Sequence, residues 1–418
     1  MHTIISHFFL LIISTILISS NIFSEVNKKA LITEQIIAGS KDKFMEVRHV
    51  VLKGTNYEIG KAIAQLAQKN HNINLTEVDN DHLLKAQRNY ISANYPALFE
   101  RMRGAANAYG RDLATDPFDI SSLNYNLAPM GCSAVYYPQD FTEAGHGILS
   151  RNFDFSTGDI MGRRVKTSGT PVISRPYIFE VYPDNGYASI YLCAFDLMGG
   201  VLDGMNSEGL VLSILADNSS GNQPPYEPLM GPGVGLNELM IMRYLLDNCS
   251  NIEQAKESLL SLKQYYFLAS LHYIVADRSG RSFVFEYSPS RNKSYIIDGS
   301  GPQCITNHLL YKYKSPDNSP AVQESWDRYS KLINATRKPK FSIDEIKQIN
   351  QMVSGNKYSF LDQNWAPSRT LWHSIYDQNE RTLEVKFYLG EKTDPHDSTR
   401  GIFEETEYYK FNLKQDKD

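Results

Sequence analysis

A cysteine, an arginine and an aspartate stand where two neighbouring strands are predicted to pair. Cys132 opens a short β-run that continues to Tyr137, and Arg151 and Asp154 lie at the end of a second run that starts at Gly147. If the two runs form an antiparallel hairpin, Arg151 and Asp154 return beside Cys132. A guanidinium close to sulfur favours the thiolate, the nucleophilic form of cysteine, and a carboxylate can orient an amine. The sequence therefore predicts a nucleophilic cysteine here.

Two properties of these residues weigh against that prediction. A single cysteine is most often a small buried hydrophobic residue. Arg151 and Asp154 are three positions apart, so their side chains point to opposite faces of a regular strand unless a twist or bulge intervenes. The residue types alone therefore suggest a catalytic cysteine and leave an ordinary structural role open.

Motifs for other kinds of catalysis are missing from the sequence. It contains no His-Glu-x-x-His, Cys-x-x-Cys, P-loop or Gly-x-Ser-x-Gly segment, and the glycines at 231, 233 and 235 lack the spacing of a dinucleotide-binding loop. The ten histidines show no metal-ligand spacing, and the carboxylates show no pairing typical of a glycosidase. We therefore expect neither a metal nor a cofactor.

The composition is that of an ordinary globular enzyme. Of 418 residues, 42% are hydrophobic and 21% are charged, which excludes a disordered or fibrous chain. The net charge of −5 argues against a nucleic-acid partner, which needs a basic surface. Four cysteines are too few for a disulfide scaffold in so long a chain. We interpret Cys193, Cys249 and Cys304 as structural, and two of them could pair in an oxidising compartment.

An apolar segment near the N-terminus predicts export. Phe8–Ile18 has the length of a signal-peptide core, although no Lys or Arg precedes it. An uncleaved anchor is the alternative, because residues 4–23 could just span a bilayer. We expect residues 1–24 to be a cleaved signal peptide. The mature chain would then have no stable membrane span and would be secreted, periplasmic or lysosomal (lumenal).

Helices and short strands are predicted in separate runs. From Met45 to about Gly110 the apolar spacing is mainly helical, and after Cys132 short β-runs alternate with helical pairs. Such runs indicate an α+β fold with largely antiparallel sheets, in which the helical N-terminal third packs with the β-rich remainder as one body. We expect helices at Tyr57–Ala67, Tyr95–Tyr109, Asn237–Asn248, Ile252–Leu262, Ala321–Ala335 and Ile343–Val353, and strands at Ser133–Tyr137, Gly147–Phe153, Tyr177–Tyr182, Tyr187–Phe195, Gly209–Ile214, Leu271–Ala276, Ser282–Tyr287, Leu371–Tyr376 and Thr382–Leu389.

An ordered set of segments resembles one family. The region around Cys132 resembles the nucleophile segment of N-terminal-nucleophile (Ntn) hydrolases, in particular the linear-amide C–N hydrolase group that contains choloylglycine hydrolases and the fungal penicillin acyltransferase. The resemblance covers roughly residues 45–390, and several motifs in family order are much harder to obtain by chance than one. The further segments are Leu52–Gly60, Gly104–Gly110, Asp203–Leu210, His272–Asp277, Phe285–Tyr287, Thr306–His308 and Pro367–Trp372.

The resemblance implies both a fold and a processing step. The fold would be a four-layer αββα sandwich, in which two antiparallel sheets lie between layers of helices. The precursor would cut its own backbone between Gly131 and Cys132, giving a helical N-terminal chain of residues 25–131 and a catalytic chain of residues 132–418. Glycine suits the first position, because it can adopt the strained backbone that an N→S acyl shift needs.

The same resemblance assigns roles around the nucleophile. After the cut, Cys132 would supply both the thiol that attacks an amide carbonyl and the α-amine that moves the proton. Arg151 would sit by the sulfur, and Asp154 would hold the α-amine. The substrate would be a linear amide, either a non-peptide or an N-acyl amide. Cleavage of its C–N bond would pass through an acyl-Cys132 intermediate.

Three further residues take roles by resemblance alone. Asn206 and Asn307 would form the oxyanion hole, and Arg369 would complete the polar network around the nucleophile. Taken singly, each has an ordinary explanation that is at least as good. Asn206 lies in a predicted turn, Asn307 at a strand end, and Arg369 in what could be a surface loop.

Rival functions remain open at this stage. The acyl group could pass to an amine acceptor, which would make the protein an acyltransferase. A papain-like protease could pair Cys132 with His146, His272 or His308, although the flanking motif of that family is missing. An uncut chain could instead be a secreted binding protein.

The substrate is expected to be a small amide. Aromatic residues near the nucleophile, Tyr136, Tyr137, Phe153 and Phe155, predict an apolar acyl pocket. A homo-oligomer is compatible with the sequence.

Overall fold

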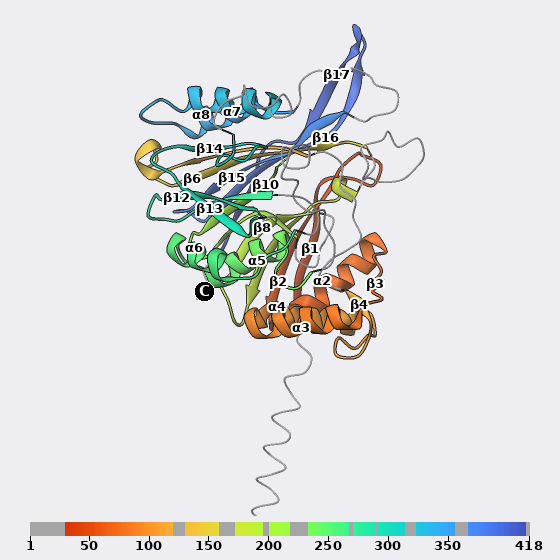
Figure 1. Ribbon diagram of the computed structural model, residues 1–418. Coiled ribbons are helices and arrows are strands. Elements are labelled where there is room, and N and C mark those ends of the chain that lie inside the picture. The colour runs from red at the N-terminus through yellow and green to blue at the C-terminus, as the bar shows by residue number, and fades with distance from the viewer. Residues whose placement is uncertain are drawn as a thin grey trace, which may run out of the picture.

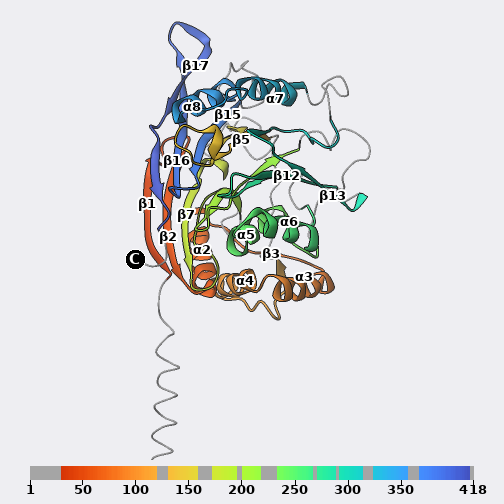
Figure 2. The ribbon, with the colours of Figure 1, turned by 90° about the vertical axis from the view of Figure 1, so that its left-hand side faces the viewer.

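The computed structural model describes residues 30–119, 130–158, 172–194, 200–217, 233–266, 271–288, 291–313, 323–355 and 367–414. Two large sheets are stacked face to face, and helices cover both outer faces (Figures 1 and 2). The layers therefore run helix, sheet, sheet, helix, and the predicted αββα architecture is confirmed. The predicted signal peptide, residues 1–24, lies outside the described residues. Within them, no helix is both long and apolar enough to cross a bilayer.

The larger sheet has nine strands and contains both halves of the chain. Every neighbouring pair is antiparallel except β2 and β7, which are parallel, so the prediction of largely antiparallel sheets is confirmed. In spatial order the strands are β1 (Leu31–Gly39), β2 (Glu46–Gly54), β7 (Tyr177–Pro183), β8 (Ser189–Cys193), β9 (Val201–Asn206), β10 (Val211–Ala216), β11 (Leu271–Ala276), β12 (Ser282–Ser288) and β13 (Lys293–Asp298).

The smaller sheet carries the predicted nucleophile. Its hairpin of β5 and β6 pairs in the register that the sequence predicted, with Ala134 opposite Arg151 and Gly131 opposite Asp154. In spatial order its strands are β14 (Gln303–Ile305), β5 (Met130–Tyr137), β6 (Ile148–Ser156), β15 (Ser368–Asp377), β16 (Thr382–Asp394) and β17 (Asp397–Glu405), with β18 (Tyr409–Asn412) also paired to β16. A separate small ladder joins β3 (Thr76–Glu77) to β4 (Phe118–Asp119).

Seven α-helices of the described residues form the outer layers. Helices α7 and α8 pack on β5 and β6, whereas α2 packs on β2 and α5 on β9 and β10 (Figures 1 and 2). Two short 3-10 helices, Gln139–Phe141 and Val172–Ser174, lie in connections. The helices are α2 (Asn56–His71), α3 (Asp81–Asn94), α4 (Pro96–Ala108), α5 (Glu238–Asn248), α6 (Ile252–Ser261), α7 (Gln323–Ala335) and α8 (Ile343–Met352).

Two glycines set the contact between α2 and α4. A Cβ at Gly60 would lie 2.0 Å from the carbonyl oxygen of Arg101, and one at Gly104 would lie 1.8 Å from that of Tyr57. The two helices therefore cross backbone to backbone, which only glycine permits. Both glycines lie in segments that resemble the family, Leu52–Gly60 and Gly104–Gly110.

The N-terminal third is less helical than predicted. Strands β1 and β2 precede α2 and form one edge of the nine-stranded sheet. β2 is buried at alternating positions such as Val50 and Leu52, a period of two that a search for helical spacing overlooks. In the Asp203–Leu210 segment, β9 ends at Asn206 and the predicted turn follows from Asn206 to Leu210.

Successive residues of β5 face different layers. Cys132, Ala134 and Tyr136 belong to the main core, which includes the facing strands of the larger sheet, whereas Val135 and Tyr137 pack under α7 and α8. The side chain of Cys132 therefore points between the two sheets. Its backbone stays accessible to groups that come from the α7–α8 layer.

A buried histidine in β15 makes the stability of the fold depend on pH. His373 contacts Ser150 and Tyr408, and burial, with the positive charges of Lys386 and Lys347, lowers its pKa to about 3. An unfolded histidine titrates near pH 6.5, so the unfolded chain binds the proton first. The stability that the neutral ring provides is therefore complete above about pH 6.5 and is lost as the pH falls towards 3.

We predict that His373→Gln reduces this pH dependence. Its free energy of unfolding, measured by urea denaturation, should fall less between pH 7 and pH 4 than that of the parent chain, even if it is lower at pH 7. The exposed His82, changed to Gln, controls for loss of a histidine. Equal slopes for the two variants would contradict the prediction.

Candidate active site

The sulfur of Cys132 lies between the sheets beside a guanidinium. Cys132 is 1% exposed, and Nη2 of Arg151 is 3.5 Å from its Sγ. The Arg151 guanidinium also lies over the ring of Phe153, the residue opposite Cys132 in the hairpin. A fixed positive charge at this distance favours the thiolate over the thiol.

Arg151 is held in place by a carboxylate from the other sheet. Its Nη1 donates to Asp203 Oδ1 at 2.7 Å, and its Nη2 donates to the Ile214 carbonyl at 2.9 Å. Asp203 Oδ2 also accepts hydrogen bonds from Ser374 at 2.5 Å and from Tyr376 at 3.3 Å. Asp203 lies in a segment that resembles the family, but no local pattern distinguishes it from the other carboxylates of the chain.

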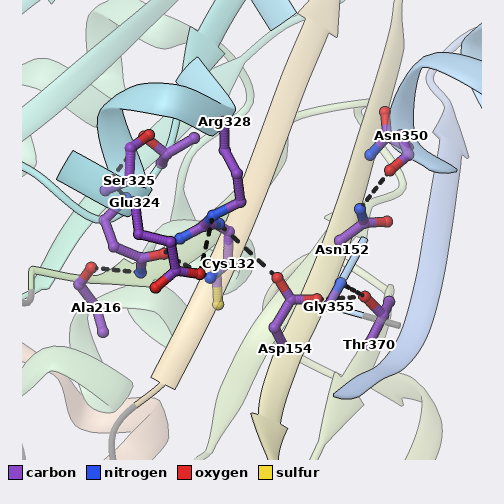
Figure 3. Close-up of polar contacts among 12 residues, drawn as sticks. Cys132, Asn152, Asp154, Ala216, Glu324, Ser325, Arg328, Asn350, Gly355 and Thr370 are labelled. Carbon is purple, nitrogen blue, oxygen red and sulfur yellow. Dashed lines mark hydrogen bonds and ion pairs between the residues drawn. The ribbon is translucent and has the colours of Figure 1, made fainter. Parts of the chain in front are cut away.

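The backbone of Cys132 is bound by groups on the other side of the strand. Its N–H donates to Asn307 Oδ1 at 2.6 Å, and its carbonyl accepts from Nη1 of Arg328 at 2.5 Å. Nη2 of Arg328 donates to the same Asn307 oxygen at 2.7 Å. Figure 3 shows Arg328 reaching down from α7 to Cys132. The nitrogen and the sulfur of one residue are thus held by separate sets of groups.

Asp154 faces the backbone rather than the sulfur. It lies opposite Gly131, and Oδ2 is 3.8 Å from Nη1 of Arg328. Oδ1 accepts a short hydrogen bond from the Thr370 hydroxyl, and the Gly355 N–H also reaches the carboxyl group (Figure 3). Arg151 and Asp154 therefore do point to opposite faces of β6, yet both contact the same short segment of β5.

Burial disfavours the ionised form of both reactive groups. It raises the pKa of the Cys132 thiol, which the Arg151 charge opposes, and it raises the pKa of Asp154, which Arg328 and the Thr370 hydroxyl oppose. A neutral thiol needs a base before it can attack.

Asn206 does not have the expected role. Its side-chain amide donates to the carbonyls of Leu246 at 3.0 Å and Cys249 at 2.7 Å, both at the end of α5. Its Oδ1 accepts from the N–H groups of Glu208 and Leu210, which closes the turn after β9. Both amide hydrogens are therefore used on the α5 side of the sheet, and we withdraw Asn206 as an oxyanion donor.

Asn307 reaches Cys132 with its oxygen and not with its amide. The Nδ2 group donates to the Ala216 carbonyl at 2.7 Å, and the backbone N–H donates to Ser325 Oγ at 2.7 Å. The expected oxyanion donor is thus an acceptor for the nitrogen of Cys132 in this structure.

Arg369 binds elsewhere. Its Nε donates to Glu391 at 2.9 Å, and its guanidinium lies over the Phe403 ring, so it fastens β15 to the β16–β17 hairpin. The second cation at Cys132, besides Arg151, is Arg328 instead. Arg328 lies on a helix that the sequence predicted, but no local pattern distinguishes it from the other charged residues of α7.

The histidines of the rival protease mechanism are engaged elsewhere. His146 pairs with Asp377, and His272 lies between Glu286 and the Thr306 carbonyl. His308 contacts Ser325 through Nδ1. In the part of the chain that the structure describes, no histidine forms a hydrogen bond with Cys132. Over the same residues, no cluster of three His, Cys, Asp or Glu side chains could hold a metal ion, and the four cysteines form no disulfide with one another.

Three of the four predicted pocket aromatics, Tyr136, Phe153 and Phe155, lie in the same core as the sulfur. Phe153 stacks on Trp372 at 4.0 Å and on Phe155 at 6.0 Å between ring centroids. Tyr137 instead packs under α7 and α8 against Phe341. Tyr136 points into the main core, where its hydroxyl contacts Gln378.

Comparison with known proteins gives a family match. The family described as "Acyl-coenzyme A:6-aminopenicillanic acid acyl-transferase" matches residues 141–394, which is more than half of the chain and includes Arg151, Asp154, Asn307 and Arg328. No curated protein matches.

Solved structures also resemble the chain at low identity. Penicillin V acylase from Agrobacterium tumefaciens is 18% identical over 61% of this chain and 83% of its own, with a TM-score of 0.42. A mutant conjugated bile acid hydrolase from Clostridium perfringens is 14% identical over 67% of this chain and 92% of its own, also with a TM-score of 0.42.

Proposed function

The chain belongs to the acyl-coenzyme A:6-aminopenicillanic acid acyl-transferase family of Ntn hydrolases, which act on linear amide bonds, and on this premise we propose that it is a self-processing enzyme with Cys132 as nucleophile. One observation carries the proposal. The sulfur of Cys132 is held by Arg151, while its nitrogen is held separately by Asn307. An N-terminal nucleophile needs this division, because one residue must be both nucleophile and base.

Self-cleavage would begin with attack of the Cys132 sulfur on the Gly131 carbonyl carbon. The S–C bond forms, the C–N bond to Cys132 breaks, and the thiol proton ends on the nitrogen that becomes the α-amine. Water then hydrolyses the thioester, which gives the Gly131 carboxylate and a free Cys132. Gly131 leaves room for this geometry, because a Cβ there would lie 3.1 Å from that of Asp154.

Turnover would use the same atoms. The α-amine takes the thiol proton, the thiolate attacks the amide carbonyl, and the proton passes to the leaving nitrogen. Arg151 stabilises the thiolate, and Asn307 Oδ1 accepts a hydrogen bond from the amine, which turns its lone pair away from Asn307. The nearby charge of Arg328 disfavours the ammonium form. The acyl group then leaves Cys132 to water.

Acyl transfer to an amine is the second candidate, favoured by the name of the matching family. Both functions share the acyl-Cys132 intermediate and differ only in the acceptor. The aromatic stack of Phe153 and Trp372 beside the sulfur supports an apolar acyl group. We therefore propose N-acyl amides as the substrate class.

The two chains are expected to stay together after the cut. Strands β1 and β2 remain paired to β7 in one sheet. A buried ion pair also joins the two chains, because Nη1 of Arg101 in α4 lies 2.6 Å from Asp247 in α5.

The proposal predicts a specific N-terminus in the purified wild-type protein. Intact mass and N-terminal sequencing should find two co-eluting chains, one of which begins at Cys132. Incubation with N-acyl amides of varied acyl length should add an acyl mass to that chain after an acid quench. A single whole chain after prolonged incubation at acidic and neutral pH would refute the proposal. Hydrolysis of short polar amides alone would refute only the apolar acyl pocket.

A further inference from the structure

The two carboxyl oxygens of Asp154 have different neighbours. Oδ1 accepts from the Thr370 hydroxyl, and that hydroxyl accepts the Gly355 N–H at 2.7 Å. Oδ2 faces Arg328 and the cut site, since a Cβ on Gly131 would lie 3.5 Å from it. Because a hydroxyl has one hydrogen, the Gly355 bond leaves that hydrogen for Asp154. Figure 3 shows this arrangement from β6 to β15.

The strand geometry aims Thr370 at Asp154. The two residues lie opposite each other in the β15–β6 pair, and the register then shifts between Thr370 and Trp372. Leu371 is the extra residue of this bulge. Bulges beside active sites commonly redirect a side chain, and this one follows immediately after Thr370.

Gly355 completes the arrangement from the α8 side. A Cβ on Gly355 would lie 3.2 Å from the Thr370 nitrogen and 3.4 Å from Asp154 Cγ. The backbone after α8 therefore approaches both residues closely. Asp154 lies between two glycines, Gly131 on the cut side and Gly355 on the other.

We propose that Thr370 is a positioning residue for the reactions at Cys132. Its hydroxyl fixes one oxygen of Asp154, so that the other faces the Gly131–Cys132 bond before cleavage and the new α-amine afterwards. Without the hydroxyl, the carboxyl group can rotate towards Arg328 and away from the amine. The inference rests on the proposed function of Cys132 and adds to it a residue that the sequence left unassigned.

The charges around Asp154 give this role a pH signature. Arg328 faces it from α7, the Cys132 thiol from β5, and Arg151 lies on its own strand; β15 and the end of α8 contribute the neutral Thr370 and the Gly355 N–H. The Thr370 hydroxyl stabilises the ionised carboxylate, so its loss raises the pKa of Asp154. The acid limb of turnover should therefore move to higher pH.

The test compares variants with and without the hydroxyl. Thr370→Val and Thr370→Ala should slow self-cleavage and turnover by about 10- to 100-fold, the value of a hydrogen bond to a charged group. Both should shift the acid limb upwards, whereas Thr370→Ser should keep the wild-type profile. Thr336→Val is the matched control, because Thr336 is 7% exposed against 6% for Thr370 and, directly after α7, donates to the Leu332 carbonyl of that helix. Thermal unfolding shows that each variant is folded.

Three outcomes would overturn the inference. Wild-type pH profiles in both hydroxyl-free variants would show that the hydroxyl does nothing for Asp154. Equal defects in Thr370→Ser and Thr370→Val, or in Thr336→Val and Thr370→Val, would show that packing alone matters. Failure of the proposed function appears differently, as an uncut wild-type chain in the same experiment.

Discussion

Replacing Cys132 with alanine is expected to leave the chain whole and to abolish turnover. The variant lacks the sulfur that attacks Gly131, and without the cut there is no α-amine to act as base. Loss of the nucleophile and the base together should lower the rate by about 10⁴-fold or more. Intact mass spectrometry measures the first effect, and amide hydrolysis measures the second.

Cys304→Ala is the matched control. Cys304 is also a buried cysteine of the smaller sheet, on β14 beside β5, but it contacts Thr336 and not the site. Its alanine variant should be cut and should turn over substrate as the wild type does. Cleavage of the Cys132→Ala chain at the same bond would identify a different nucleophile.

The sequence predicted the part of the site that depends on local pairing. Cys132, Arg151 and Asp154 belong to one hairpin, whose two strands are neighbours in the sequence. Arg151 and Asp154 point to opposite faces of β6, but both can act at Cys132 because they contact different atoms of β5. The sulfur meets Arg151 between the sheets, and the backbone meets Asp154 and Arg328 on the other side.

The site residues that were not predicted come from other layers of the fold and reach Cys132 and Arg151 only through tertiary packing. Asp203 comes from the facing sheet and Arg328 from the covering helix, 52 and 196 positions from their partners Arg151 and Cys132. No short motif encodes such distances. Asn206 and Arg369 were assigned by motif alone, and each is held by neighbours of its own, at the turn after β9 and at Glu391.

The fold was predicted more completely than the site. Helices and hairpins with strong periodicity appear where expected, and the αββα layers follow from them. The expectation of helix from Met45 was wrong for β2, which pairs in parallel with β7 across more than a hundred residues. The alternating burial of β2 is typical of a strand, but its pairing with β7 depends on tertiary contacts that no local pattern reveals.

Asp203→Asn is expected to destabilise the fold severely and to remove activity. Asp203 is the carboxylate partner of Arg151, and both side chains are almost completely buried. Asparagine has the same shape but leaves the guanidinium charge without compensation between the sheets. Breaking a buried pair in this way costs about 3–5 kcal/mol. Urea unfolding should be measured in the Cys132→Ala background, so that every variant is one uncut chain.

Two further variants separate buried charge from the loss of any ion pair. Asp298 also pairs with a cation, Lys256 at 2.6 Å, but its side chain is 66% exposed, so Asp298→Asn should cost no more than about 1 kcal/mol. The double variant Asp203→Asn/Arg151→Met should recover stability relative to Asp203→Asn, because it removes the unpaired charge. With Cys132 restored, it should still be inactive, since the sulfur has lost its cation. If Asp203→Asn and Asp298→Asn lower the free energy of unfolding equally, Arg151 does not depend on Asp203. The position of Arg151 at the sulfur would then be maintained by its remaining contact with the Ile214 carbonyl.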